Sequence, residues 1–560
     1  MRSSIFLLGF VLAFPLCAQE SPKAVPELKK EELCSVAGIV IDAADSAPLK
    51  KARVSLDNPE MRGHSYFTFS GADGKFKLEG VAPGRYTLSV SRNGFVDQKY
   101  GQKSPEGQGA VLALEPRQKL SDLVFKLIRS SVISGRVLDE DGEPMPRVTV
   151  QALRLSYHEG QKQFLPEARA ETDDRGEYRL FDLEPGGYYL NASAANGALV
   201  FDTSRVIFAG EPRPRMGYAP VYYPGGADPS QAAQVQVGPG EEVPSIDFLF
   251  FPVRTFRLRG RVVSSIPEQT GRGVMVWLEG HGKNALAFVD RRATSVTDEQ
   301  GSFEIEDVPS GSYALTGLMS ASGKRYSAQI PVDIGNADVE GITLVIGPGI
   351  DLPGHIQIEG SDRAQFNELG VSLQPVPGSR FSGAGSLVKP DGTFLLRNVS
   401  EAEYRVALRG QPDRFYLKSA RLGTDDVLNK PLVVKQGGTH DTLELTLSSG
   451  AASVRGHVLN DDSLPVPAAR VALVPEPSQR DQLRLYRAAT TYQFGKFILR
   501  GIAPGDYKIF AWEEIEQGAW QDPDFIHTYE DKGRAIQLGE GADQSVELRV
   551  IRAKQSSQNP

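Results

Sequence analysis

Residues 73–90 of the chain read Asp73-Gly74-Lys75-Phe76-Lys77-Leu78-Glu79-Gly80-Val81-Ala82-Pro83-Gly84-Arg85-Tyr86-Thr87-Leu88-Ser89-Val90. Apolar and polar residues alternate on both sides of the Pro83-Gly84 pair, and a period of two is typical of half-buried β-strands. Gly74 stands where a turn would enter the first strand, and Gly84 where the chain would reverse into the second. Glycine tolerates the backbone conformations that such turns require. The stretch therefore predicts a β-hairpin.

The hairpin pattern recurs along the chain. In each copy an aromatic residue stands just after the first turn, and a second aromatic follows ten residues later. The five pairs are Phe76 and Tyr86, Tyr178 and Tyr188, Phe303 and Tyr313, Phe394 and Tyr404, and Phe497 and Tyr507. Because a repeated spacing marks a repeated structural unit, we predict five units and assign these ten aromatics to their cores. The fourth copy has Ala402 in place of the second turn glycine, which predicts an altered turn there.

Short alternating segments before and after each hairpin predict further strands, with Gly and Pro in the turns between them. Short strands of this kind are typical of a seven-stranded antiparallel β-sandwich. We therefore predict an all-β chain of five tandem sandwiches, named units one to five. Their predicted ranges are 34–129, 131–253, 256–347, 350–448 and 452–552, followed by a disordered tail at 553–560. The linkers have only a few residues, which predicts a semi-rigid rod on the order of 150 Å.

Residues 1–18 are typical of a secretory signal peptide. Arg2 precedes an apolar run at 5–14, and Ala18 stands at the predicted cleavage site. The apolar run is shorter than a membrane span, and no later segment is long and apolar enough to be a transmembrane segment. We therefore predict a periplasmic or secreted protein. A lipidated Cys17 is the alternative, although Leu16 is larger than the residue that a lipoprotein signal places there.

Charge and cysteine content restrict the partners further. The formal charge is −8 for the whole chain and becomes −9 once Arg2 is removed with the signal peptide. An acidic chain of this kind is repelled by phosphate backbones and by anionic lipid, so we predict no nucleic-acid partner. Cys34 is the single cysteine that remains after cleavage, so no intramolecular disulfide can form.

The order Gly-x-Val, then Pro and Val-x-Leu, then Asp-Gly-x-Phe and Pro-Gly-x-Tyr resembles the carboxypeptidase regulatory-like domain. It is also similar to the collagen-adhesin B-type repeat of the prealbumin-like sandwiches. The resemblance covers nearly the whole mature chain, and such tandem arrays resemble exported proteins of soil bacteria, particularly acidobacteria. It implies a prealbumin-like or carbohydrate-binding-like fold. It implies little about function, because one fold serves many functions.

The family name suggests a metal-dependent carboxypeptidase. That resemblance would imply a His-x-x-Glu pair that binds zinc together with a distant third ligand. His527 and Glu530 have the pair spacing, but no histidine follows them in the chain. We therefore predict no catalytic residue, no resident metal and no cofactor. Asp139 and Asp141 are weak calcium candidates, since calcium binds carboxylates in acidic loops. A solvated turn is the favoured interpretation of these two residues.

The residues that depart from the repeat are mostly aromatic. Unit two has Tyr222 and Tyr223 in an insertion rich in Pro and Gly. Unit five has a second group after Tyr507, consisting of Trp512, Trp520, Asp522, Phe525, His527 and Tyr529. Aromatic faces beside carboxylates are typical of sugar-binding sites, since sugar rings have apolar faces and polar rims. Two interpretations stay open: an exposed binding surface, or rings that their own loop buries.

The sequence thus favours a non-catalytic binding or scaffold protein of the cell envelope. Its expected partner is an unknown envelope protein or polysaccharide. A carbohydrate-binding protein that uses the aromatic loops of unit five is the second interpretation, and a metal-dependent carboxypeptidase is a disfavoured third.

Overall fold

The computed structural model describes residues 32–58, 65–103, 107–194, 215–266, 269–280, 292–321, 324–360, 368–376, 384–435 and 441–552. The predicted signal peptide at 1–18 and the predicted tail at 553–560 lie outside the described residues. Within these ranges the chain is nearly all β, and ten sheets enclose five large hydrophobic clusters. The predicted class of tandem β-sandwiches is confirmed.

Two sheets face each other in every unit. The first sheets consist of the following strands: in unit one, β4 (Lys75–Val81), β1 (Cys34–Asp42) and β8 (Lys119–Leu127); in unit two, β12 (Glu177–Leu183), β9 (Ser131–Leu138), β17 (Glu242–Val243) and β18 (Phe248–Leu249); in unit three, β14 (Met216–Tyr218), β19 (Pro252–Ser264), β22 (Ser302–Pro309) and β25 (Val339–Ile346); in unit four, β29 (Thr393–Val399), β26 (Ile350–Glu359), β34 (Leu443–Ser448), β31 (Tyr416–Leu422) and β32 (Asp425–Asp426); and in unit five, β38 (Lys496–Ile502), β35 (Ala452–Leu459) and β41 (Asp543–Arg549).

The second sheets consist of the following strands: in unit one, β3 (Ser65–Phe69), β2 (Arg53–Asp57), β5 (Gly84–Ser91), β6 (Gln98–Lys99) and β7 (Val111–Leu114); in unit two, β11 (Gln161–Glu171), β10 (Val148–His158), β13 (Gly186–Ala194), β15 (Val221–Tyr222) and β16 (Val235–Val237); in unit three, β21 (Arg292–Val296), β20 (Met275–Gly280), β23 (Gly311–Ala321) and β24 (Lys324–Ile334); in unit four, β28 (Gly385–Leu387), β27 (Gly370–Pro375), β30 (Ala402–Arg409) and β33 (Leu432–Val434); and in unit five, β37 (Arg487–Thr490), β36 (Arg470–Pro475), β39 (Gly505–Trp512) and β40 (Arg534–Leu538).

The helical segments of the described residues are short. They are η2 (Pro229–Gln231), η3 (Pro477–Gln479), η4 (Leu483–Leu485), η5 (Ala519–Gln521) and α1 (Pro523–His527). None of them is long enough to span a bilayer.

The first and last strands of a unit pair in parallel. The sequence predicted wholly antiparallel sandwiches, and this part of the prediction is wrong. β1 pairs with β8, β19 with β25, β26 with β34 and β35 with β41 in this sense. A parallel pair requires a long crossover, and the intervening strands of the unit provide it. Since both strands run in one direction, a unit begins at one end of its sandwich and finishes at the other. Consecutive units can therefore join through short linkers.

A glycine in the first strand permits the last strand to approach closely. At Gly456 in β35, a Cβ atom would lie 1.9 Å from the carbonyl oxygen of Val546 in β41. At Gly38 in β1, the matching distance to the carbonyl oxygen of Leu123 is 2.2 Å. Any side chain at these positions would displace the neighbouring backbone, so the repeated glycine is a packing requirement of the parallel pair.

All ten repeated aromatics are buried, as predicted. The tyrosine of the second hairpin strand also closes the turn before it, because its hydroxyl donates to the carbonyl oxygen four residues earlier. These bonds join Tyr86 to Ala82 (2.8 Å), Tyr188 to Glu184 (2.8 Å), Tyr313 to Pro309 (3.0 Å), Tyr404 to Ser400 (2.9 Å) and Tyr507 to Ala503 (2.8 Å). Unit four therefore keeps the bond that closes this turn, despite Ala402.

A buried hydroxyl four residues before the first turn glycine is a further shared feature, which the sequence analysis missed. In unit five, Thr491 Oγ1 accepts a bond from Ala469 N at 2.8 Å and donates to Val466 O at 2.7 Å. Ser70, Thr172 and Thr297 make the corresponding two bonds in units one to three. A buried backbone donor and acceptor are thereby satisfied at the same place in four units.

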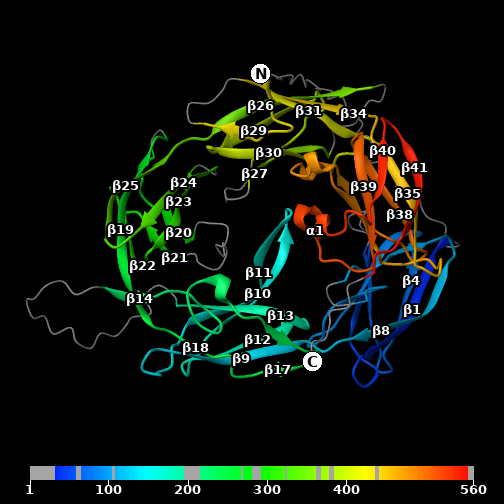
Figure 1. Ribbon diagram of the computed structural model, residues 1–560, viewed down its shortest axis with the longest axis horizontal. Helices are drawn as coiled ribbons and strands as arrows, with labels where there is room; N and C mark the ends of the chain where they lie inside the picture. The colour runs from blue at the N-terminus through cyan, green and yellow to red at the C-terminus, as the bar shows by residue number, and fades with distance from the viewer. Residues whose placement is uncertain are drawn as a thin grey trace, which may run out of the picture.

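The units follow one another around a ring (Figure 1). Unit one, in blue, lies beside unit five, in orange and red, and in units two to five the first sheets lie outside the second sheets. The hairpin of β10 and β11 points toward the inside of the ring, where α1 lies (Figure 1). The predicted rod is therefore wrong, because unit one and the β10–β11 hairpin of unit two both contact unit five, which is far from them in the sequence.

Candidate functional site

The chain after β39 folds back over its own sheet, on the face that points away from the core of the sandwich, and forms η5 and α1. Asp522 caps α1, since its Oδ1 accepts bonds from Asp524 N at 2.8 Å and from Phe525 N at 3.3 Å. Pro523 occupies the first turn of the helix, where a missing N–H costs nothing. These local signals place the aromatic residues of the segment against the sheet.

Trp512 and Trp520, the two tryptophans predicted as binding residues, are buried. Their relative exposures are 2% and 5%. Trp512 stacks on Phe510, with ring centroids 5.1 Å apart and an interplanar angle of 13°, and Tyr529 meets it edge-on at 5.9 Å. A sugar platform requires a free ring face, so the burial argues against the prediction for both tryptophans. The loop covers an apolar sheet face instead.

Arg470 covers the ring of Trp520. Its guanidinium carbon lies 4.2 Å from the ring centroid, a separation at which cation–π attraction is significant. Burial lowers the pKa of Arg470 to about 10, which still leaves the group charged at neutral pH. The indole face that a ligand would need is thus occupied by a side chain of β36.

The other predicted residues of unit five lie at the surface of this cover. Asp522, Phe525 and Tyr529 are half-buried, and His527 is exposed. Phe525 packs against Tyr157 from the β10–β11 hairpin of unit two, with ring centroids 6.1 Å apart. Burial raises the pKa of Tyr157 to about 12, and the nearby carboxylates of Asp522 and Glu516 add to the effect. The predicted ligand surface is therefore in part a contact between units.

The tip of the β10–β11 hairpin contacts unit five and unit four. At Gly160, which has a φ of +75°, a Cβ atom would lie 2.5 Å from the carbonyl oxygen of Gln521. Glu159 lies 3.8 Å from Arg405 of β30 in an ion pair. Only a glycine therefore fits at this tip, and the hairpin spans from unit two to two other units.

Unit one and unit five meet at β7. Gln493 accepts a bond from Ala113 N at 3.0 Å and donates to Ala113 O at 2.9 Å, while Val111 forms a parallel bridge with Tyr492. Arg85 lies over the ring of Tyr492 at 5.2 Å. An ion pair of 2.5 Å between Lys103 and Glu513 adds a further contact. These contacts join the two ends of the array and close the ring.

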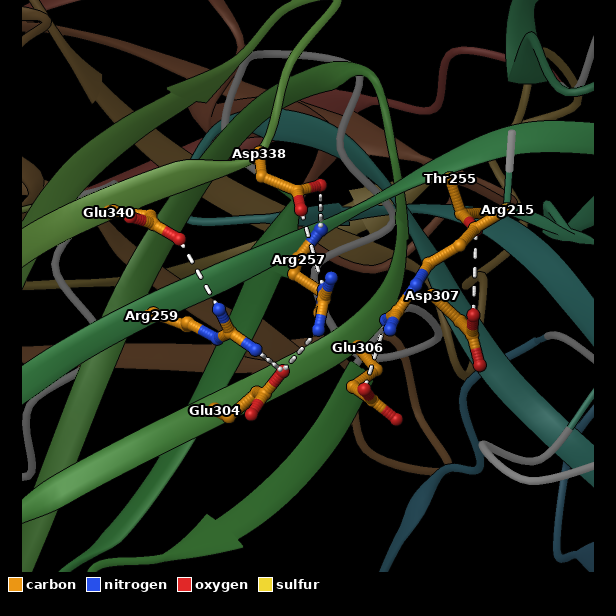
Figure 2. A network of polar contacts seen from close by, with 9 residues as sticks. All are labelled: Arg215, Thr255, Arg257, Arg259, Glu304, Glu306, Asp307, Asp338 and Glu340. Carbon is orange, nitrogen blue, oxygen red and sulfur yellow. Dashed lines mark hydrogen bonds and ion pairs between the residues drawn. The ribbon is translucent and has the colours of Figure 1, made fainter. Parts of the chain in front are cut away.

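Units two and three share a strand. The first residues of β19 pair with β14, which lies in the insertion of unit two, and the rest of β19 belongs to unit three. Arg215, just before β14, lies 2.9 Å from Glu306 of β22. Figure 2 shows this pair at one end of a network of charged side chains on the outer face of the sheet.

Two arginines of β19 form the centre of this network. Arg257 N donates to Asp338 at 2.9 Å, and Arg259 lies 3.0 Å from Glu304 and 3.3 Å from Glu340 (Figure 2). The backbone bond from Arg257, aided by its guanidinium, holds the pKa of Asp338 below its usual range. Exposed pairs of this kind contribute little singly, but here they connect β19 to both β22 and β25.

The remaining junctions use polar side chains at defined positions. Asn398, which has a φ of +54°, accepts a bond from Gly349 N at 3.0 Å and donates to the carbonyl oxygen of Arg325 in unit three. Between units four and five, Tyr416 donates to Glu540 at 2.9 Å. The junctions of unit four with units three and five are thus fixed by hydrogen bonds as well as by the linkers.

The tyrosines of the unit-two insertion also pack on the protein. Tyr222 is buried in β15, and Tyr223 is half-buried with its ring 6.3 Å from that of Phe248. Tyr218 donates to Glu140 at 3.1 Å and packs edge-on against Phe250. The structure does not bring Tyr222 and Tyr223 together with the aromatics of unit five into one surface.

The weak calcium candidates and Glu530 of the disfavoured zinc pair make their contacts within the protein. Asp139 Oδ1 accepts bonds from Asp141 N at 3.0 Å and from Glu143 N at 2.8 Å, which is the geometry of a turn. Burial of Glu530 opposes its ionisation, but Lys508 and Arg480 outweigh it and hold the pKa of this carboxyl below its usual range. Among the described residues no group of three metal-ligating side chains converges.

Tyr157, Gly160 and Gln493 were not predicted from the sequence. The residues joined by the buried hydroxyl are 24 apart in unit two, 18 in unit one and 22 in unit five, so this spacing alone does not single out the long hairpin. No local signal identified Gln493, because it contacts a residue 380 positions away.

The fold and these contacts define a multidomain β-sandwich protein. The family model of the carboxypeptidase regulatory-like domain matches residues 35–115 and 132–206, in units one and two. No curated protein matches the chain.

Several solved structures are similar to parts of the chain. The streptococcal ancillary pilin is 12% identical, with 57% of this chain and 99% of that chain covered and a TM-score of 0.21. The major pilin subunit of Bacillus cereus is 11% identical, with 56% of this chain and 99% of that chain covered and a TM-score of 0.14. The minor pilin of Streptococcus agalactiae is 16% identical, with 39% of this chain and 95% of that chain covered and a TM-score of 0.16. These scores are too low to support a function, which must be argued from the chain itself.

Proposed function

We propose that the chain is a non-catalytic scaffold or binding protein of the cell envelope, in which the sandwiches are held in a ring. The observation that carries this proposal is the contact of Gln493 with Ala113, which ties unit five to unit one. A scaffold must hold its surfaces at fixed relative positions. The segments that depart from the repeat are used for that purpose here, in the β10–β11 hairpin and in the cover of unit five.

Export is part of the proposal. The signal peptide at 1–18 would deliver the chain to the periplasm or the medium, and its partner would be an envelope protein or polysaccharide. An origin in a soil bacterium such as an acidobacterium is likewise proposed from the sequence resemblance. Sequencing the N-terminus of the protein recovered outside the cytoplasm tests the export step, with Gln19 expected as the first residue.

Co-sedimentation tests the proposed function. Residues 19–560 are mixed with peptidoglycan sacculi and, separately, with outer-membrane vesicles of a Gram-negative bacterium. We expect saturable retention in at least one pellet. Full recovery in both supernatants contradicts the binding role. Release of C-terminal amino acids from model peptides in the presence of zinc contradicts the non-catalytic assignment.

The aromatic loop of unit five is not proposed as a sugar-binding site. The burial of Trp512 and the position of Arg470 over Trp520 leave neither indole a free face.

A further inference from the structure

Unit one carries two exposed phenyl rings side by side. Phe67 and Phe69 of β3 are 60% and 57% exposed, and their ring centroids lie 6.2 Å apart. Isolated surface apolar residues are ordinary, whereas these two rings are adjacent and form one contiguous apolar patch. The two rings lie on the outer face of the second sheet of unit one, because Tyr66 between them packs on the core.

Other units cover the corresponding face with their own chain. In unit five, Phe510 and Trp512 lie under η5 and α1. In unit two, Leu153 and Phe164 pack with Tyr222 of the insertion. In unit one, within the described residues, no such cluster forms over Phe67 and Phe69. Among the described residues, the face that units two and five cover is therefore left open in unit one.

Small alcohols and charges surround the two rings. The strand register places Phe67 beside Ser55, which in turn pairs with Ser89, and Phe69 beside Arg53, which pairs with Ser91. The guanidinium carbon of Arg53 lies 5.1 Å from the centroid of Phe67, but this ring is still 60% exposed, whereas Trp520 under its arginine is 5% exposed. Asp57 and Thr87 continue the polar rows along the same face.

The size of the apolar area separates two classes of partner. A stable protein–protein interface buries about 800 Å² on each side, whereas one aromatic side chain supplies about 150–250 Å² even when wholly buried. Two half-exposed rings in a polar field are too small for such an interface. They fit a sugar chain, whose apolar C–H faces stack on aromatic rings while its hydroxyls bond to alcohols and charged groups.

We propose that Phe67 and Phe69, with Arg53 and the serine rows of β2 and β5, bind a polysaccharide of β-linked sugars. β-Linkages between equatorial positions keep a sugar chain extended, with its C–H faces accessible along its length. Because the two ring planes are inclined at 82°, the rings would contact successive sugars of a chain that twists between them. This site is separate from the ring contacts, so it stands or falls independently of the scaffold function.

Isothermal titration of residues 19–560 with cellohexaose, chitohexaose and xylohexaose tests the proposal, with maltohexaose as the α-linked comparison. We expect at least one β-linked probe to bind, and the F67A/F69A variant to bind it at least tenfold more weakly. The F67Y/F69Y variant retains the ring faces and should restore binding.

Two matched variants control for the loss of exposed apolar surface. Leu387→Ala removes a 70% exposed residue just before buried Val388 of unit four, as Phe69 stands just before Ser70, and Phe181→Ala removes a 59% exposed phenyl ring from unit two. Both should bind the probe as the unmodified chain does. Absence of binding to every β-linked probe overturns the proposal, as does binding that the F67A/F69A variant retains. Loss of self-association in that variant, measured by sedimentation, identifies a protein contact and also overturns it.

Discussion

The side-chain amide of Gln493 in unit five occupies the place of a β-strand partner for Ala113 in unit one, accepting from its N–H at 3.0 Å and donating to its carbonyl at 2.9 Å. One side chain thus satisfies both backbone groups of an edge residue in β7. Together with the bridge between Val111 and Tyr492, it makes the first and last units neighbours.

Replacing Gln493 by Ala should loosen this closure. Two hydrogen bonds of partly buried groups are lost, which corresponds to about 1–3 kcal/mol in the contact between the units. Hydrogen exchange of residues 110–114 should accelerate by roughly 5- to 100-fold. The exposed Gln517 provides the control, and Gln517→Ala should leave exchange at β7 unchanged. Equal exchange in both variants would show that Gln493 does not hold the units together.

Gly160→Ala should detach the β10–β11 hairpin from unit five. The added Cβ would lie 2.5 Å from the carbonyl oxygen of Gln521, and the positive φ destabilises Ala by about 1 kcal/mol or more. Gly142→Ala is the matched control, because Gly142 has a φ of +80° and a Cβ added there would meet no atom within 4 Å. Faster exchange at residues 519–527 is expected for Gly160→Ala alone. The same exchange in both variants refutes the docking contact.

Thr491→Val should destabilise unit five by about 1–3 kcal/mol, because it leaves Ala469 N and Val466 O buried without their partner. The two side chains have nearly the same shape, so packing is conserved. Urea unfolding followed by tryptophan fluorescence reports on this unit through Trp512 and Trp520 when both proteins also carry Trp277→Phe, which removes the tryptophan of unit three. Thr343→Val, at an exposed position of β25, should change stability by less than about 0.5 kcal/mol. A Thr491→Val variant as stable as the unmodified chain would contradict the role of the hydroxyl.

Unit four should lose stability at alkaline pH through Tyr404. Burial raises the pKa of Tyr404 to about 12, whereas an unfolded tyrosine has a pKa of about 10. Because the folded pKa is raised, the stabilising contribution is complete below pH 10 and is lost as the pH rises toward 12. The expected slope is about 1.4 kcal/mol per pH unit, measured by hydrogen exchange of unit-four peptides in urea. Tyr404→Phe should remove this share of the slope while lowering stability at neutral pH. An unchanged slope in Tyr404→Phe assigns the alkaline loss to other groups.

The sequence predicted what local patterns determine. The spacing of Phe76 and Tyr86 follows from two paired strands and a turn, and all ten repeated aromatics are buried. Ala402 shows the limit of arguing from a turn glycine: unit four still closes its turn through the bond from Tyr404 to Ser400. The parallel pairing of first and last strands escaped prediction, because alternation along a strand carries no information on the direction of its neighbour.

The candidate site could not be predicted in the same way. An aromatic segment with acidic residues can form an exposed sugar-binding surface, or it can bury its rings against a neighbouring sheet. Which of the two occurs depends on whether the face of that sheet is apolar. Phe510 and Trp512 make that sheet face apolar in unit five, so the segment folds back upon it. The exposed Phe67 and Phe69 followed the ordinary alternation of a strand and gave no signal that distinguished them from core residues.

Small-angle X-ray scattering of residues 19–560 tests the ring most directly. The ring predicts a radius of gyration of about 30 Å, somewhat above the ~24 Å of a compact globule of this length. A linear array of about 150 Å would instead give about 43 Å, the value for a thin rod of that length. A radius near 30 Å that increases in the Gln493→Ala variant supports the closure of unit one onto unit five. A radius above about 40 Å for the unmodified chain would contradict it.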